Sequence, residues 1–317
     1  MRTAFFRLAV PLVLMLVSNV FPFAARAATL RPATIQAWDR YYLWADAKVS
    51  REVKNTQAFL IQDHLSSKDK EEVQRALRSG KTYVDRVNGV IPANENFSVP
   101  DGEIHHWWGT VLVPHVKLGE LLIFLKDYNR HAGKFSDVIS SRLLSQEGDH
   151  FTFFFGLMRA KSFVTAYYHT VQEAFYYSID SKHAWSKSVA TRIVELENPG
   201  TPKERELPAR EDRGYLWRLA SWWRLLETDQ GVVVEIESAS LSRDIPMFVR
   251  FIPGVSSYIL STPKESMESV LLSIRKQFVN PKSGNAQVPS PHYLGGPSSV
   301  TTSKGLSSNV CGCPAFN

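Results

Sequence analysis

The spacing of hydrophobic residues changes twice along the chain, and these changes divide it into three parts. Before residue 100, apolar residues recur every three or four positions, which predicts a helix with one apolar stripe. That stripe consists of Ile35, Trp38, Tyr42, Ala45, Val49 and Val53. A second helix is predicted over SSKDKEEVQRALRS, which begins at a serine cap and ends before Gly80. Residues 28–100 are therefore expected to form a helical extension.

From Gly102 onward, apolar and polar residues alternate, which is typical of strands. The predicted strands are GEIHHWWGTVLVP, DVISSRLLSQ, HFTFFFGLMR, FVTAYYHTVQEAFYY, AWSKSVATRIVELE, GYLWRLASWWRLLE and VVVEIESASLS. KTYVDRV, before them, reads as one more short strand. Most of the connections are short and polar, so neighbouring strands should form hairpins in an antiparallel sheet.

Two further helices are predicted around this sheet. KLGELLIFLKDYNRHAGKF follows the first strand, with Leu118, Leu121, Leu122 and Leu125 on one face. Near the C-terminus, Thr262 and Pro263 read as the cap and first residue of a helix over STPKESMESVLLSIRKQF. Its apolar stripe consists of Met267, Val270, Leu271, Ile274 and Phe278. PMFVRFIPGVSSYIL, just upstream, is expected to be a short helix or a lid.

Together these elements predict an α+β fold over residues 101–279. A curved antiparallel sheet of six to seven strands with one apolar face must cover that face, and the long C-terminal helix is the available cover. Space that the helix does not fill would become a cavity. Residues 280–317 are rich in Ser, Pro and Gly and are expected to be a disordered tail.

Residues 1–27 have the three-part pattern of a secretory signal peptide. Arg2 and Arg7 provide a basic start, an apolar run extends to Phe21, and the small residues Ala25 and Ala27 precede a cleavage site after residue 27. A membrane anchor is the alternative, but the run falls short of the roughly 20 residues that a span needs. We therefore expect a protein exported to the periplasm or secreted.

Charge and motifs narrow the function classes. Loss of the three arginines of residues 1–27 would reduce the formal charge from +6 to +3, without the basic stripe that nucleic acid requires. Cys311 and Cys313 lie at the end of the chain, and neither a disulfide-stapled core nor a metal role is expected. The sequence contains no phosphate-binding loop and no G-x-S-x-G motif, so no cofactor or catalytic residue is predicted.

TDQG joins the last two strands and predicts a register in which paired residue numbers sum to 459, with Arg224 opposite Glu235. Alternation then assigns one face to the core or to a cavity wall. This face contains Tyr215, Trp217, Leu219, Trp223, Leu225, Val232, Val234 and Ile236. The other face, with Arg218, Trp222, Arg224, Glu235 and Glu237, is expected to be solvated and to carry cross-strand ion pairs. Polar anchors in a buried pocket are the alternative.

The two histidines of GEIHHWWGTVLVP should point to opposite faces of their strand, so they cannot jointly bind a metal. His106 shares its face with Ile104, Trp108 and Thr110. It is either a hydrogen-bonded strand histidine or a general base or ligand contact. Because two tryptophans also point to opposite faces, both faces should be covered, one of them by the helices of residues 28–100.

The strand, helix, strands and helix order resembles the START-like, or helix-grip, superfamily, which includes lipid-transfer domains, pollen-allergen-like proteins and polyketide cyclases. Residues 102–279 carry the resemblance, through LGELLIFLKDYNRHAGKF, the hairpins and SRDIP before the last helix. IHHWWG, SVATRIVELENPG and GYLWRLASWWR are also similar to exported, uncharacterised bacterial members. The resemblance implies a fold and a pocket but no reaction, and the 28–100 extension departs from it.

These observations predict an exported protein that binds a lipid-like molecule in an aromatic-lined cavity. The expected pocket wall consists of His106, Trp108, Tyr215, Trp217, Trp223, Ile236, Met267, Leu271 and Ile274. The alternatives are a cyclase-like enzyme that uses His106 or a tyrosine as acid–base, and an interaction protein with a filled core. A hydrophobic small molecule is the expected partner, nucleic acid is not expected, and peripheral membrane contact stays open.

Overall fold

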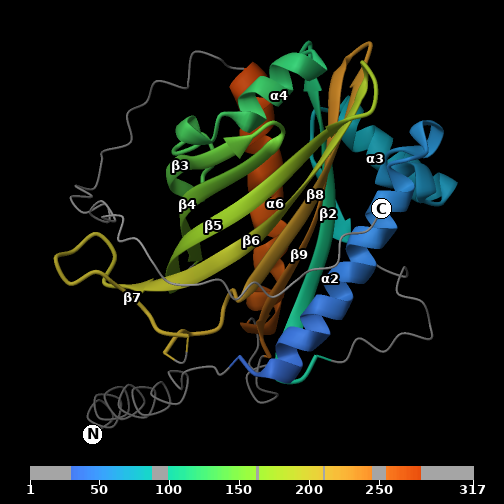
Figure 1. Ribbon diagram of the computed structural model, residues 1–317. Helices are drawn as coiled ribbons and strands as arrows, with labels where there is room; N and C mark the ends of the chain where they lie inside the picture. Colours follow the sequence, from blue (N-terminus) through green and yellow to red (C-terminus); the bar gives the residue numbers. More distant parts are fainter. Residues whose placement is uncertain (1–29, 88–98, 162–163, 210, 245–254, 280–317) are drawn as a thin grey trace, which may run out of the picture. The chain divides into compact units, whose positions relative to one another are not determined.

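The strands form one nine-stranded antiparallel sheet in a computed structural model that describes residues 30–87, 99–161, 164–209, 211–244 and 255–279. The order is β1-β2-β9-β8-β6-β5-β4-β3, and β7 pairs with β6 (Figure 1). The bounds are β1 Tyr83–Arg86, β2 Gly102–Pro114, β3 Val138–Glu147, β4 His150–Lys161, β5 Val164–Ser178, β6 His183–Glu197, β7 Arg205–Glu206, β8 Arg218–Thr228 and β9 Gly231–Arg243. Every predicted strand is present, including the short strand in KTYVDRV as β1, and β7 is a strand that the sequence did not predict. With β1 and β7 the sheet has more than the predicted six to seven strands.

The helices lie before, between and after the strands. The α-helices are α2 Pro32–Glu52, α3 Ser67–Arg78, α4 Leu118–Lys126 and α6 Val255–Val279, and the short 3-10 helices are η2 Thr56–Ala58, η3 Ile61–His64 and η4 Tyr128–Arg130. None of the helices in the described part of the chain is long and apolar enough to cross a bilayer. The predicted signal peptide, the tail with Cys311 and Cys313, and residues 246–254 lie outside the described residues.

The C-terminal helix begins earlier than the sequence predicts. It starts at Val255 and runs through Pro263, so the predicted cap at Thr262 is wrong. A proline in a helix interior removes one backbone N–H and crowds the preceding turn, but the hydrogen bonds on either side can continue the helix. Residues 255–262, upstream of Pro263, therefore belong to α6, and the rest of the predicted short helix or lid lies outside the described residues.

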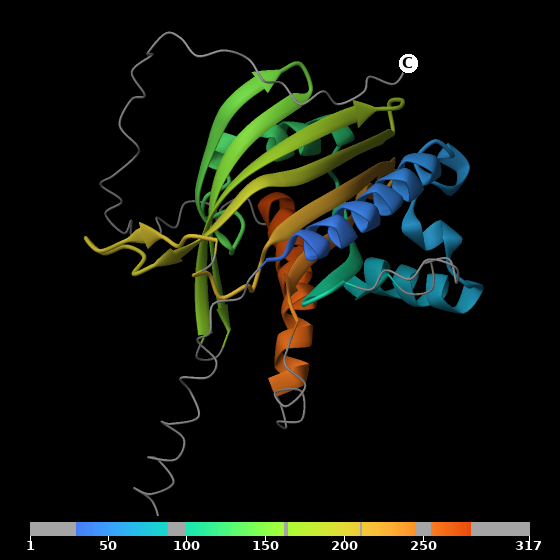
Figure 2. The same cartoon turned by 60° about the horizontal axis from the view of Figure 1, so that its bottom comes forward.

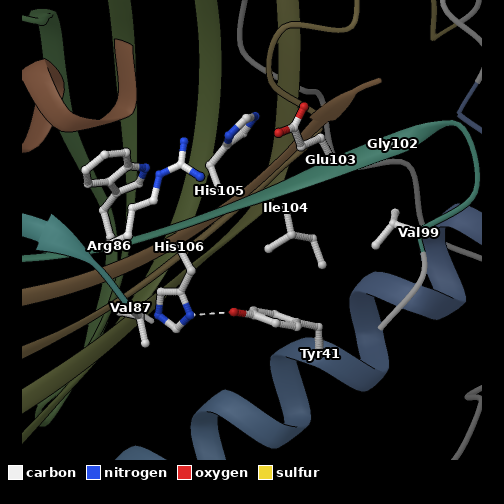
Figure 3. Close-up of a pocket in the computed structure, with 10 residues that line it drawn as sticks. Tyr41, Arg86, Val87, Val99, Gly102, Glu103, Ile104, His105 and His106 are labelled. Atoms are coloured by element: carbon white, nitrogen blue, oxygen red, sulfur yellow. Dashed lines mark hydrogen bonds between the residues drawn. The ribbon is translucent and has the colours of Figure 1, made fainter. Parts of the chain in front are cut away.

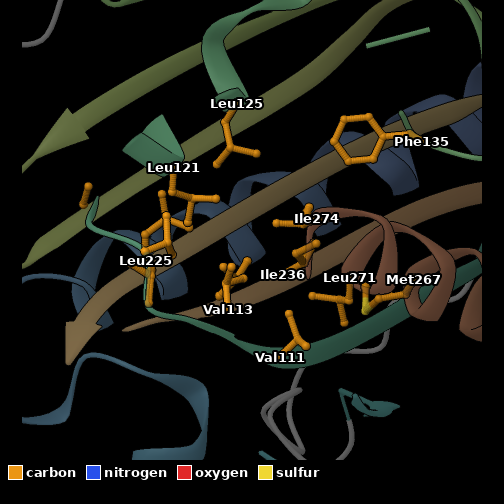
Figure 4. Packing of buried hydrophobic residues seen from close by; sticks show 14 of the residues in the cluster. Val111, Val113, Leu121, Leu125, Phe135, Leu225, Ile236, Met267, Leu271 and Ile274 are labelled. Atoms are coloured by element: carbon orange, nitrogen blue, oxygen red, sulfur yellow. The ribbon is translucent and has the colours of Figure 1, made fainter. Parts of the chain in front are cut away.

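The inner face of the sheet packs against α6 (Figures 1 and 2). Met267, Leu271 and Ile274 of α6 join the apolar residues of β2, β8 and β9 in one core cluster (Figure 4). Gly109 of β2 permits this close approach. A Cβ atom there would lie 2.9 Å from Leu271 and 3.0 Å from the sulfur of Met267. The predicted cover by the C-terminal helix is thus confirmed.

The outer face of the sheet is covered by the 28–100 extension, which is visible in Figure 2 as α2 lying across the strands. Trp38, Ala45 and Val49 of the predicted stripe are buried there, together with Tyr41 and Lys48. α3 begins at a Ser66 cap, as predicted. A sheet with helices on both faces is what the paired tryptophans of β2 predicted.

The β8–β9 hairpin has the predicted register. Arg224 pairs with Glu235 and Trp222 with Glu237 across a tight turn from Thr228 to Gly231. Gly231 has a φ of 135°. An added Cβ would lie 2.2 Å from a backbone oxygen of the neighbouring β2, so glycine is required here. The predicted α+β class, an antiparallel sheet closed by a C-terminal helix with an N-terminal helical extension, is confirmed.

Candidate functional site

The inner face of β8 and β9 is partly accessible to solvent, although a helix covers it. In β8, Leu219, Ser221 and Trp223 are half-buried, whereas the intervening residues that face α2 are largely buried. In β9, Ser238 and Ser240 are likewise half-buried, whereas Ala239 and Leu241 are fully buried. α2 therefore seals its face of these strands, and α6 leaves part of the other face open.

Three polar groups meet at the centre of this open wall. The indole Nε1 of Trp223 donates a hydrogen bond to Ser221 Oγ at 3.1 Å. The Ser221 and Ser188 hydroxyls are 2.9 Å apart, across the β6–β8 pair. We call Ser188, Ser221 and Trp223 the hydroxyl cluster. Its members come from two neighbouring strands at one level of the sheet, and they present one large aromatic ring beside two hydroxyl groups.

Toward the β8–β9 turn, the same face becomes mainly apolar and tightly packed, up to Glu227 beside the turn. Leu225, Val232, Val234 and Ile236 are buried there against α6. A second group of rings lies on the β4 side, where Tyr128 stacks on Phe153 at 3.8 Å between ring centroids. The inner face thus has a closed apolar end and a half-open end that carries hydroxyl groups.

The outer face contains a buried network of charges instead of the solvated pairs that the sequence predicted. Lys48 of α2 lies 2.9 Å from Glu237, and Arg224 lies 3.3 Å from Glu237 and 2.6 Å from Glu52. Arg224 and Glu237 are each 1% exposed. The prediction of a solvated face is wrong because α2 covers it and supplies partners of both signs.

The environment of Glu237 keeps its carboxyl ionised. Burial alone would raise its pKa, but His106, Lys48 and Arg224 hold the pKa well below its usual range. A carboxylate with two cations and a histidine around it is a strong anchor between α2 and the sheet. This network explains how the charged residues of β8 and β9 are accommodated in the interior.

Glu235, two residues earlier, lies in a different environment. Its carboxylate accepts hydrogen bonds from the backbone N–H of Ile61 at 2.5 Å and of Gln62 at 3.4 Å, and from the Gln62 side chain at 3.2 Å. Burial nevertheless raises the pKa of Glu235 to about 7, because Arg224 and the backbone donors offset only part of the desolvation. The carboxyl is therefore half protonated near neutrality and ties η3 to the sheet.

A pocket of about 330 Å³ lies beside the first residues of β2, beyond the end of β1 (Figure 3). On the α2 side of this pocket, Tyr41 Oη and His106 Nδ1 are 2.7 Å apart, and His106 Nε2 lies 3.1 Å from Glu237. Burial raises the pKa of Tyr41, so its phenol stays neutral. Arg86 and Glu103 line other parts of the pocket. The two ring nitrogens of His106 are thus contacted by Tyr41 and by Glu237 in the outer layer.

The residues predicted to form one pocket wall lie in different places. Trp223, Ile236, Met267, Leu271 and Ile274 share the inner face with α6. His106, Trp108 and Trp217 lie in the outer layer under α2, and Tyr215 is 41% exposed. Their predicted role in ligand binding stays a prediction.

Trp217 shows why the assignment by alternation failed at that end of the strand. It precedes β8, so the regular alternation of the strand does not apply to it. Its indole donates to Asp212 at 3.0 Å on the outer side. Ser188 and Ser221 were not among the predicted site residues. Ser221 could have been predicted, because it lies two residues before Trp223 in the same strand and therefore shares its face. Ser188 could not, because it reaches this face through the β6–β8 pairing.

Among the described residues, no group of three or more His, Cys, Asp or Glu side chains is placed to hold a metal ion. The inner wall presents the hydrogen-bonding groups of the hydroxyl cluster and apolar surface. The outer layer offers a histidine between a tyrosine and a carboxylate.

Comparisons with known proteins give structural similarities alone. No family model matches the chain, and no curated protein matches it. A STAR-related lipid transfer protein from Xanthomonas axonopodis is 16% identical with a TM-score of 0.37, over 56% of this chain and 96% of that one. Human STARD10 is 10% identical with a TM-score of 0.36, over 71% and 84%. The Zhui aromatase/cyclase from Streptomyces is 9% identical with a TM-score of 0.31, over 57% and 99%.

These structures fall within the superfamily that the sequence resembles. With TM-scores below 0.5 and low identities, they carry no inference about the ligand or a reaction of this protein. We therefore base the function on the residues of this chain.

Proposed function

We propose that this protein is an exported binding protein for a hydrophobic small molecule, which it holds between the inner face of the sheet and α6. The observation that carries the proposal is the uneven burial of β8 and β9. Ala220, Trp222 and Arg224 of β8 face α2 and are buried, whereas the alternate residues Leu219, Ser221 and Trp223 stay partly exposed beneath the helix layer. A partly accessible aromatic wall beside an apolar core is the kind of surface that hydrophobic ligands occupy.

The two alternatives have less support. An enzyme that uses His106 would bind its substrate in the pocket beside the first residues of β2 and not on the inner face, because His106 lies with Tyr41 on the outer side of the sheet. A completely filled core would leave the inner residues of β8 as buried as those facing α2, and they are not. The apolar end near Leu225 is filled, so the ligand would occupy the half-open end.

A binding titration tests the proposal. Purified protein, stripped of bound molecules, is titrated with pyrene, a neutral fluorescent hydrocarbon, and compared with the Trp223→Ala variant. We expect pyrene to bind the parent, and the variant to bind it at least about fivefold more weakly, because most of one aromatic contact is lost. Tyr177→Ala, at a 38% exposed site where the ring stacks on Trp185 of the outer face, is the matched control and should bind like the parent. Absence of pyrene binding by the parent would refute the proposal.

Export is a separate part of this proposal and rests on the basic, apolar and small-residue pattern of residues 1–27. N-terminal sequencing of protein taken from the cell envelope should find a chain that starts near Ala28. Recovery of a chain with intact Met1 from the cytoplasm would refute export and would leave the binding proposal unaffected.

A further inference from the structure

The hydroxyl cluster has an unused capacity to donate a hydrogen bond. Ser221 Oγ accepts the indole N–H of Trp223, and one hydroxyl hydrogen is spent in the contact between Ser188 and Ser221. Two serines carry two such hydrogens, so one remains whichever serine acts as the donor. Ser188 and Ser221 are both half-buried, so the remaining hydrogen lies at a surface that a ligand can reach.

The inner positions around this cluster carry no charge. Alternation along the paired strands places their inward residues in one continuous surface. Among described residues, the inward positions nearest to the cluster are Thr170, Gln172, Ala174, Ser186, Ala190, Leu219, Ser238 and Ser240. Gln172 donates to Thr170 at 3.1 Å, and Ser238 donates to a backbone oxygen at 3.3 Å. The surface is therefore polar but neutral.

At the described inward positions of β4, β5, β6, β8 and β9, charged residues occur only toward the two ends of the strands, and each has a partner. On the neighbouring β1 and β2, Arg86 lies 5.0 Å over the Trp107 ring and His105 lies 3.0 Å from Ser242 Oγ. Glu227, near the β8–β9 turn, accepts from the backbone N–H of Leu118 at 2.7 Å. At the other end, Arg159 lies 2.7 Å from Asp137, and Glu195 lies 2.5 Å from Arg213. No inward position of these strands between the two ends offers a counter-charge to a bound ion, as far as the structure describes them.

We infer that the ligand is an uncharged amphiphile whose hydroxyl or carbonyl oxygen accepts a hydrogen bond from the Ser188–Ser221 pair. Its apolar part would lie against Trp223 and the apolar residues beyond it. An ionised head group would lose its hydration without gaining an opposite charge, which costs far more than moving a neutral hydroxyl to the same place. This inference rests on the proposed function and specifies its ligand class.

The test compares three amphiphiles of the same chain length: a fatty alcohol, a fatty acid in its ionised form and an alkyltrimethylammonium. Each displaces pyrene from the full-length protein, and Ser221→Ala and Ser188→Ala are measured beside the parent. Ser79→Ala, at the exposed end of α3, is the matched control. We expect the alcohol to bind tightest, and either serine variant to weaken the alcohol about five- to tenfold while pyrene binding is retained.

The outcomes separate the two proposals. If pyrene binds but the fatty acid or the ammonium competes as well as the alcohol, the neutral head group is refuted and the binding function stands. If the alcohol binds tightest but neither serine variant weakens it, the assignment to the hydroxyl cluster is refuted. If nothing apolar binds to the parent, the proposed function itself fails.

Discussion

The two faces of β8 and β9 are made by alternate residues of the same strands, yet they are built in opposite ways. The outer face buries Arg224, Glu235 and Glu237 completely under α2 and η3. The inner face carries no charge at the hydroxyl cluster, and there it leaves Trp223 and Ser221 partly exposed under α6. Alternation decides which residues share a face, but the covering helix decides whether that face is sealed.

The largest expected effect separates two adjacent tryptophans. Trp222 is 1% exposed and donates to Asp46 of α2 at 2.9 Å, whereas Trp223 is half-exposed. Trp222→Ala should lower the free energy of unfolding by about 3–5 kcal/mol, because a large cavity opens between packed layers. Trp223→Ala should lower it clearly less. Urea denaturation followed by circular dichroism gives both values, and equal losses would contradict the difference between the faces.

Loss of one charge from the outer network is the next largest effect. Lys48→Met should cost about 3 kcal/mol, because Glu237 would stay buried with only part of its compensation, from Arg224 and His106. Lys117→Met removes a cation that is 75% exposed and lies 3.0 Å from Glu227, and should change stability little. Chemical denaturation of both variants checks this. A Lys48→Met protein as stable as the control would show that the network does not anchor α2.

The outer face should also make stability depend on pH through Glu235. Its pKa is raised from 4.5 to about 7 in the folded protein. Between these values the unfolded chain releases a proton that the folded chain keeps, so this residue makes stability fall as pH rises from 4.5 to 7. Glu235→Gln should remove that fall, and above pH 7 the variant should be more stable than the parent by about 3 kcal/mol.

Glu237 supplies the matched contrast, because its pKa is held below the usual value of 4.5. Its contribution is present above that value and is lost as pH falls below it. Denaturation midpoints measured from acidic to neutral pH distinguish the two contributions, because that of Glu235 changes above pH 4.5 and that of Glu237 changes below it. A Glu235→Gln variant with the same pH profile as the parent would rule out this titration.

The smallest expected effect comes from adding volume to each face. Ala239→Val inserts two methyl groups under α2, where Ala239 is 0% exposed, and should cost about 1–2 kcal/mol. Ser240→Val, one residue later, points to the half-open inner face and should be nearly neutral. Thermal unfolding of the pair measures the difference. Similar losses would mean that the inner face is as closed as the outer one.

Much of the fold could be predicted because its signals are local. The strands alternate, the stripe of Met267, Leu271 and Ile274 marks α6, and the short turn before Gly231 sets the register of β8 and β9. Residues separated by a few positions carry all of this information. The start of α6 was missed because Pro263 resembles a first helical residue, whereas here it lies inside the helix.

The candidate site was predicted less well because it depends on contacts between distant segments. The stripe of α2 was visible, but no local pattern shows which surface receives it. Lys48 was the informative residue, because a lysine within an apolar stripe requires a buried carboxylate, and β9 carries two. The hydroxyl cluster depends on the β6–β8 pairing, which joins strands that are not consecutive in the sequence.

β8 and β9 contribute residues to the core under α2 and to the core under α6, so detachment of either helix would expose buried residues of the same two strands. Opening α2 would bring Arg224 and Glu237 into contact with water, and opening α6 would expose Ile236, the residue before Glu237 in β9. Backbone amides in the centre of β9 should therefore exchange their hydrogens only in the global unfolding of the molecule. Since both helical layers pack on the same strands, we expect the two layers and the sheet to unfold as one cooperative unit.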